Sequence, residues 1–209
     1  RTMPRHTASN NAHRSTISQS AKLYFDSPEA DPDLRTTYDR LFAPADAEQS
    51  AAMDAHRAAT VATEAEHADV VVKDERVDDV VRRVDVWVDV NHGKEGVRTL
   101  NSLWGDRGYG ALTRLPYAEE VQALQDFIRR VDGGASLAIN VSLMAELRVA
   151  VQELAEALAR RAHAEAHQAA CSARLQAANT AFDDAWSRLV KHAKLVLGDE
   201  LGRLAPDLG

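Results

Sequence analysis

Histidine and glutamate side chains at helical spacing are the groups in this sequence best suited to chemistry. His163 and His167 lie four residues apart, and Glu64 and His67 lie three apart. Within a helix, each pair therefore shares one face. Three imidazoles and one carboxylate suit zinc, iron, nickel or copper. The four residues are therefore the candidate ligands of a transition-metal ion.

This candidate metal site depends on the register between two long helices. If Asn91 lies level with Val141 in an antiparallel pair, position 67 faces position 165, midway between the two histidines of the second helix. Glu165 is expected to point away from the site. A slip of one helical turn would move the candidate ligands by about 5 Å. The alternative is that the histidines are solvated side chains on polar faces, with no metal between them.

The helices themselves are predicted from the distribution of glycine and proline. Two tracts, 45–92 and 135–197, contain neither residue, and both residues are costly in a helix interior. We therefore expect an all-α fold based on a long antiparallel helical hairpin. Its two long helices span about 44–92 and 141–201. A short helical insertion, 93–140, connects them.

The apolar pattern supports packing of these helices at a shallow angle. In the first tract, valines recur at spacings of seven, four, three and four residues, at Val70, Val77, Val81, Val84 and Val88. Such spacing is typical of heptad packing. The run 84–90 also alternates with period two, as a strand would, but the stripe continues through it without a break and favours a helix.

Alanine dominates the other half of the predicted hairpin, at about 43–68 and 155–181. Alanine buries little apolar area, and the hydrophobic contribution scales with that area. Such a two-helix stalk is weak alone, so the sequence predicts a homo-oligomer. A four-helix bundle from two hairpins would be the simplest form.

The chain carries two regions of opposite charge. Its formal net charge is −7, but residues 1–25 carry four basic residues and no acidic one, which leaves −11 for the rest. We divide the chain into a basic polar arm, 1–31, and an elongated helical domain, 32–209. The arm could be a targeting segment, a solvated tail, or a segment that docks on an acidic protein surface. The acidic balance argues against nucleic-acid binding.

Several classes of protein are disfavoured by what the sequence lacks. One cysteine excludes an intrachain disulfide framework. No run of apolar residues reaches the roughly 20 that a membrane span needs, and no apolar segment of a secretory signal follows the basic start. We therefore expect a cytoplasmic protein. No arrangement typical of a nucleophilic or acid–base enzyme is recognisable, so an enzyme is not the favoured class.

Three functions remain open on the sequence. The leading hypothesis is a structural or interaction protein, a self-associating helical-bundle subunit or adaptor. The second is a metal-binding four-helix bundle that uses the His/Glu cluster. The third is a small-molecule sensor with a pocket under the 93–140 insertion, where four aromatic residues gather in sequence: Trp87, Trp104, Tyr109 and Tyr117.

Overall fold

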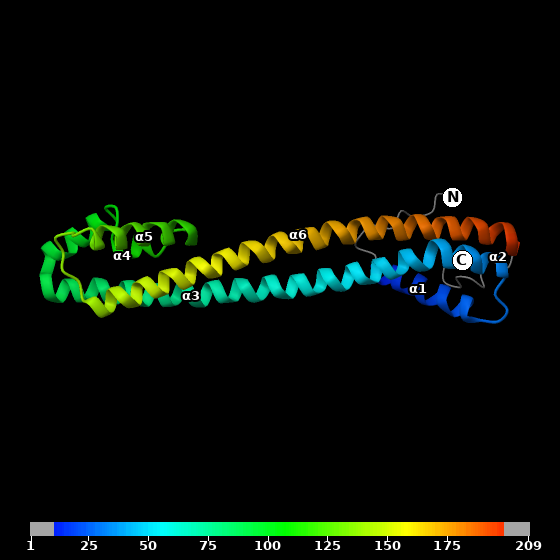
Figure 1. The fold of residues 1–209 in the computed structure, drawn as a ribbon, viewed down its shortest axis with the longest axis horizontal. Helices are drawn as coiled ribbons and strands as arrows, with labels where there is room; N and C mark the ends of the chain where they lie inside the picture. The colour runs from blue at the N-terminus through cyan, green and yellow to red at the C-terminus, as the bar shows by residue number, and fades with distance from the viewer. Residues whose placement is uncertain (1–10, 199–209) are drawn as a thin grey trace. The chain divides into compact units, whose positions relative to one another are not determined.

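Every regular element in the part of the chain that the structure describes is helical. The computed structural model describes residues 11–198, and no strand occurs among them. The elements are α1 (Asn11–Asp26), α2 (Pro32–Thr37), the π-helix η2 (Tyr38–Phe42), α3 (Ala43–Leu103), α4 (Tyr109–Leu112), α5 (Tyr117–Asp132) and α6 (Val141–Leu197) (Figure 1).

The chain divides into two compact units. Unit 2 is Thr60–His167, and unit 1 combines the residues up to Ala59 with those from Gln168 onward. The long helices α3 and α6 contribute to both units, whereas α4 and α5 belong to unit 2 and α1, α2 and η2 belong to unit 1.

In unit 2, α3 and α6 run antiparallel. Arg160 of α6 donates to Asp69 of α3 at 2.5 Å, and further along α3 Arg83 pairs with Glu146. Residue numbers therefore increase along α3 while those of the contacting residues decrease along α6. The expected antiparallel hairpin is confirmed, and the run 84–90 is helical, as the continuous stripe predicts.

The core of unit 2 is built from the valine stripe of α3 and its counterpart on α6. Its buried members include Val77, Val84 and Val88 of α3 with Leu147 and Leu154 of α6. The insertion completes this core, because it contributes Trp104, Leu112, Leu124 and Phe127. The rings of Trp104 and Phe127 meet edge to face, with centroids 5.9 Å apart. Such pairs add about 0.5–1.5 kcal/mol to the burial of their apolar area.

The helix expected to end near position 92 changes direction there and then continues. Gly93 has φ +58° and ψ −157° inside α3, and helical backbone resumes as far as Leu103. A Cβ atom on Gly96 would lie 2.2 Å from the Cβ of His92. The bend therefore needs glycine at both positions. Gly93 supplies a backbone conformation almost restricted to glycine, and Gly96 allows the close approach of the His92 side chain.

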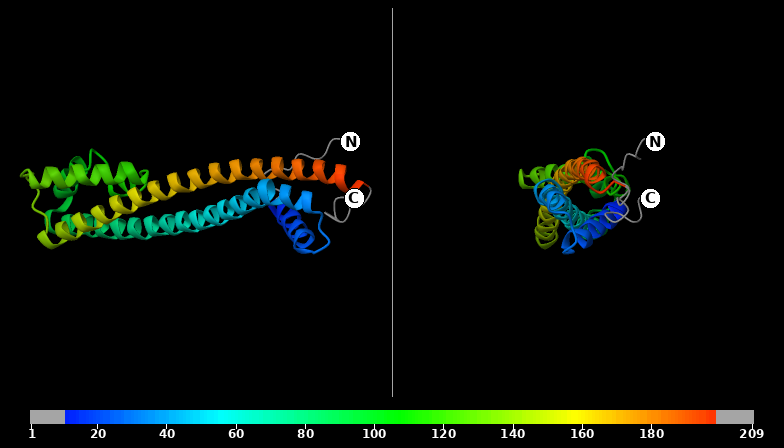
Figure 2. Two further views of the ribbon diagram at one scale, coloured as in Figure 1. Left: turned by 45° about the vertical axis from the view of Figure 1, so that its right-hand side comes forward. Right: turned by 90° about the vertical axis from the view of Figure 1, so that its right-hand side faces the viewer.

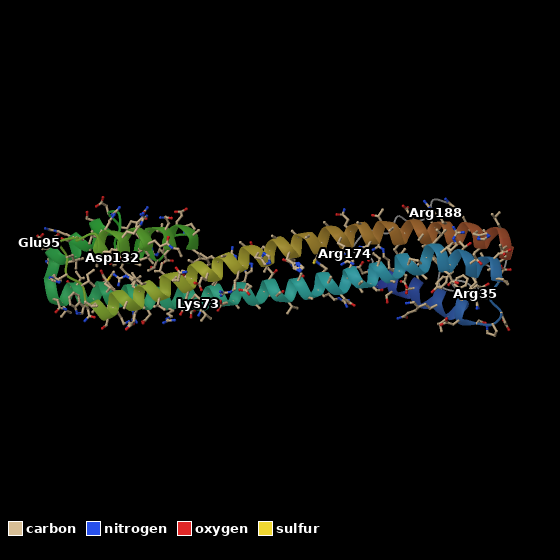
Figure 3. The ribbon with its side chains drawn as sticks, in the orientation of Figure 1. Arg35, Lys73, Glu95, Asp132, Arg174 and Arg188 are labelled. Atoms are coloured by element: carbon tan, nitrogen blue, oxygen red, sulfur yellow. The ribbon has the colours of Figure 1, made fainter. Side chains whose placement is uncertain are left out.

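Two arginine contacts hold the C-terminal end of α5 against its neighbours. Arg130 donates to the backbone oxygen of Leu103 at 3.0 Å, which satisfies a carbonyl at the end of α3. Asp132, the last residue of α5, accepts from Arg148 of α6. Figure 3 shows Asp132 on α5, and Lys73 on α3, among the charged side chains of unit 2.

Unit 1 has a separate core, in which α1 packs on the beginning of α3 and the end of α6 (Figure 2). Ile17, Ala21 and Phe25 of α1 are buried there with Phe42 and Phe182. The segment 11–26 is therefore a docked helix within the region assigned to the basic arm. Residues 1–10 of that arm lie outside the described residues, as do residues 199–201 of the last predicted helix.

Candidate functional site

The four predicted metal ligands lie in unit 2, on exposed positions of α3 and α6. His67 contacts Glu165, with Nε2 and Oε1 3.0 Å apart. Glu165 thus faces α3, and the expectation that it points away is wrong. Among residues 11–198, no three side chains of His, Cys, Asp or Glu are arranged to hold a metal ion. Glu64, His67, His163 and His167 do not form such a group.

The register explains this placement. His67 meets Glu165 as expected. Elsewhere in unit 2, however, α6 partners lie about one turn nearer its N-terminus than that register implies. Asp69 meets Arg160, for example, three residues before position 163. The expected register between α3 and α6 agrees with the His67–Glu165 contact but not with the other contacts between the two helices. A shift of one helical turn is enough to separate the candidate metal ligands.

A segment without a core lies at the same level of unit 2. Between positions 60 and 69 of α3 only Thr63 is buried, and between positions 158 and 167 of α6 no residue is buried. Exposed ion pairs link the helices there instead, such as Arg160 with Glu66 at 3.2 Å. Exposed pairs contribute little, typically about 0–1 kcal/mol. This coreless segment therefore lacks the apolar burial that normally stabilises helices in water.

The apolar residues of the coreless segment face outward. On α3, Val61, Ala65, Ala68 and Val72 are exposed at spacings of four, three and four residues, and we call them the α3 seam. Val61 is 65% exposed and Val72 is 60% exposed. At about 100° per residue the α3 seam lies opposite the buried side of its helix. Its spacing is that of a heptad contact surface.

A second outward stripe lies on α6. Ala159, Ala162 and Ala166 are exposed at spacings of three and four residues, and we call them the α6 seam. They lie opposite Ala157, which is fully buried in the core of unit 2. Small side chains allow two helices to approach closely. The alanine content alone does not assign these residues to a face of the helix.

The two segments that carry the seams differ in formal charge. Positions 60–69 of α3 contain three acidic residues and no lysine or arginine, a formal charge of −3. Positions 158–167 of α6 contain Arg160 and Arg161 against one acidic residue, Glu165, a formal charge of +1. Within the chain these charges already pair, Arg160 with Glu66 and Asp69 and Arg161 with Glu165.

A buried carboxyl group is the second unusual feature of unit 2. Glu120, in the first turn of α5, is 1% exposed, and its Oε1 has no hydrogen-bond partner. Glu120 shares a side-chain hydrogen bond with Asp74 of α3 and also feels the charge of Asp78, one turn further along α3. Asp78 likewise has a buried oxygen, Oδ1, without a hydrogen-bond partner.

Burial raises the pKa of Glu120 to about 8, because desolvation disfavours the ionised form. The neighbouring charge of Asp74 and the hydrogen bond to it act in the same direction. Desolvation also raises the pKa of Asp74 and of Asp78. The arrangement therefore holds a proton between Glu120 and Asp74, since two adjacent carboxylates do not readily ionise together.

Glu120 is not among the site residues predicted from the sequence, although the chain carries a signal for it. Glu120, Leu124 and Phe127 follow one another at spacings of four and three, on the buried face of α5. A glutamate in an apolar stripe is a candidate for a buried, protonated carboxyl group. Its partners Asp74 and Asp78 carry no comparable signal, because the contact is tertiary.

No protein-family model, curated protein or solved structure matches this sequence. Among residues 11–198, no helix has both the length and the apolar character needed to cross a membrane.

Proposed function

We propose that this protein is a structural subunit that acts by binding further copies of itself. In this proposal, the α3 seam of one copy packs on the α6 seam of a second copy. The contact would cover the coreless segment of both chains. The exposed apolar stripes of this segment are the single observation that carries the proposal.

The coreless segment favours a helical partner over a small ligand. Its exposed apolar residues follow heptad spacing, which matches the grooves of another long helix. A second copy supplies such a helix, because each chain carries both seams. Val61 and Val72 would bury most apolar area in this contact, since they are the largest side chains of either seam.

Light scattering of the full chain across micromolar concentrations tests the proposal. The wild-type protein is expected to show a mass above that of the monomer, with a mass that rises with concentration. The double substitution Val61→Glu with Val72→Glu should raise the dissociation constant by more than about tenfold, because it places charges in an apolar contact. Both positions are exposed, so circular dichroism should show unchanged helix content.

Leu195→Glu is the matched control. Leu195 is also an exposed aliphatic residue on a long helix, at 85% exposure, but it lies outside both seams. This variant is expected to associate as the wild type does. A wild-type protein that remains monomeric throughout the range would contradict self-association. Equal loss of association in both variants would contradict the seam as the contact surface.

A further inference from the structure

The N-terminal end of α5 meets α3 through the carboxyl groups of Glu120, Asp74 and Asp78. Glu120 is buried in a mostly apolar setting, next to Val121 on its own helix and one turn from Leu124. An ionised carboxylate at this position would face two further acidic side chains with no cation to balance it in the described contacts. Only a protonated Glu120 can donate a hydrogen bond to Asp74.

The charged groups around this contact do not neutralise it. From α3, the acidic residues Asp74 and Asp78 act on Glu120, and Glu75 acts on Asp74. From α4, the hydroxyl of Tyr109 is influenced by Asp78 and by Arg82, whose own carboxylate partner is Asp79. From α6, Arg148 pairs with Asp132 at the opposite end of α5.

We propose that the proton held by Glu120 is a latch that docks the N-terminal half of α5 on α3, and that loss of this proton loosens the helix. Ionised Glu120 would repel Asp74 and Asp78 and would need water. The Arg130 and Asp132 contacts hold the other end of α5 at any neutral pH. Loosening therefore begins at the Glu120 end and exposes Leu124 before Phe127.

The direction of the pH effect follows from the raised pKa. The pKa of Glu120 is about 8 when α5 is docked, against 4.5 for the unperturbed group. Docking is therefore favoured most below the lower value and progressively less as the pH rises through the folded value. Protonation of Asp74 and Asp78 also favours the docked state of α5 at lower pH, because burial raises the pKa of both groups.

Hydrogen–deuterium exchange of the full chain at about pH 6 and about pH 9 tests the latch, with each rate divided by the intrinsic rate at that pH. In the wild type, the protection of amides in positions 121–128 should fall by more than about tenfold between the two conditions, because up to tenfold is lost per pH unit between the two pKa values. Amides of α6 at positions 147–157 serve as the internal reference and should change far less.

Three substitutions make the test specific to Glu120. Glu120→Gln keeps the shape and the hydrogen-bond donor but cannot ionise, so the pH dependence of α5 protection should disappear. Glu119→Gln changes the adjacent, exposed glutamate and should retain the wild-type pH dependence. Asp74→Asn, which removes one of the repelling charges, should reduce the dependence.

Two outcomes would overturn the latch. One is wild-type protection of α5 that is equal at both pH values. The other is a Glu120→Gln variant whose protection falls with pH as steeply as that of the wild type. The protection of α5 is compared at two pH values within each variant. A general loss of stability in a variant therefore does not produce the predicted change in pH dependence.

Discussion

Single charged side chains decide how firmly the short helices of each unit are held. Arg14 of α1 is 2% exposed and makes a bidentate contact with Asp183 of α6, with Nε–Oδ1 at 3.0 Å and Nη2–Oδ2 at 2.7 Å. Removing the carboxylate of such a pair costs more than the pair itself contributes, because the guanidinium remains buried. The docking of α1 therefore depends on a residue far away in sequence.

Asp183→Ala should lower the free energy of unfolding of unit 1 by about 3 kcal/mol, because it removes the bidentate carboxylate contact of the buried Arg14 guanidinium. Urea denaturation followed by circular dichroism measures the change. Asp184→Ala is the matched control, since Asp184 is the exposed neighbour on the same helix and should change stability by less than about 0.5 kcal/mol. Equal effects of the two substitutions would contradict a structural role for the Arg14–Asp183 pair.

Among the helices, two glycines determine where α3 bends. Gly93 adopts φ +58° within α3, and Gly96 lies against the side chain of His92. The bend turns the end of α3 so that Leu100 and Trp104 reach the core of unit 2. A straight helix would carry these residues past the core, so the glycines position the insertion on which the Glu120 contact depends.

Gly93→Ala should lower the free energy of unfolding by about 1–3 kcal/mol, because an alanine is strained at this positive φ. Gly110→Ala provides the contrast. Gly110 lies in the helix α4, and a Cβ there would have no neighbour within 4 Å. That substitution should be neutral or stabilising by up to about 1 kcal/mol. Thermal unfolding of both variants measures the difference, and equal destabilisation would contradict the role of Gly93.

The sequence predicts the helices because their signals are local. The glycine- and proline-free tracts and the valine heptads identify α3, α6 and their antiparallel packing. The sequence predicts a helix end at Gly93, where the structure shows a bend, because a glycine cap and a glycine bend look alike in sequence. The docked helix α1 was not predicted, since the burial of Arg14 depends on Asp183.

The candidate sites were harder to predict than the helices. Spacing within each helix predicts the His/Glu cluster, but metal binding also requires the register between helices, which sequence spacing does not fix. The buried carboxyl of Glu120 needs the insertion to fold back on α3. The α3 seam, by contrast, can be predicted from the sequence, because its residues have heptad spacing: Val61, Ala65, Ala68 and Val72.

At the scale of the whole molecule, the proposed contact joins two different surfaces. Within unit 2, the α3 seam and the α6 seam point away from each other, so neither can pair with the other in the same chain. A contact between unlike surfaces is heterologous, and it repeats from copy to copy unless the rotation closes a ring. The proposed assembly therefore grows beyond a dimer, which distinguishes it from a symmetric pair of hairpins.

The most direct test of this central claim is a mixing experiment measured by light scattering. One variant carries Val61→Glu with Val72→Glu in the α3 seam, and the other carries Ala162→Glu with Ala166→Glu in the α6 seam. Each variant alone should be monomeric, and an equimolar mixture should form a one-to-one dimer that does not grow, because only one intact contact remains. A mixture that stays monomeric, or a single variant that still assembles as the wild type does, would contradict the pairing of the α3 seam with the α6 seam.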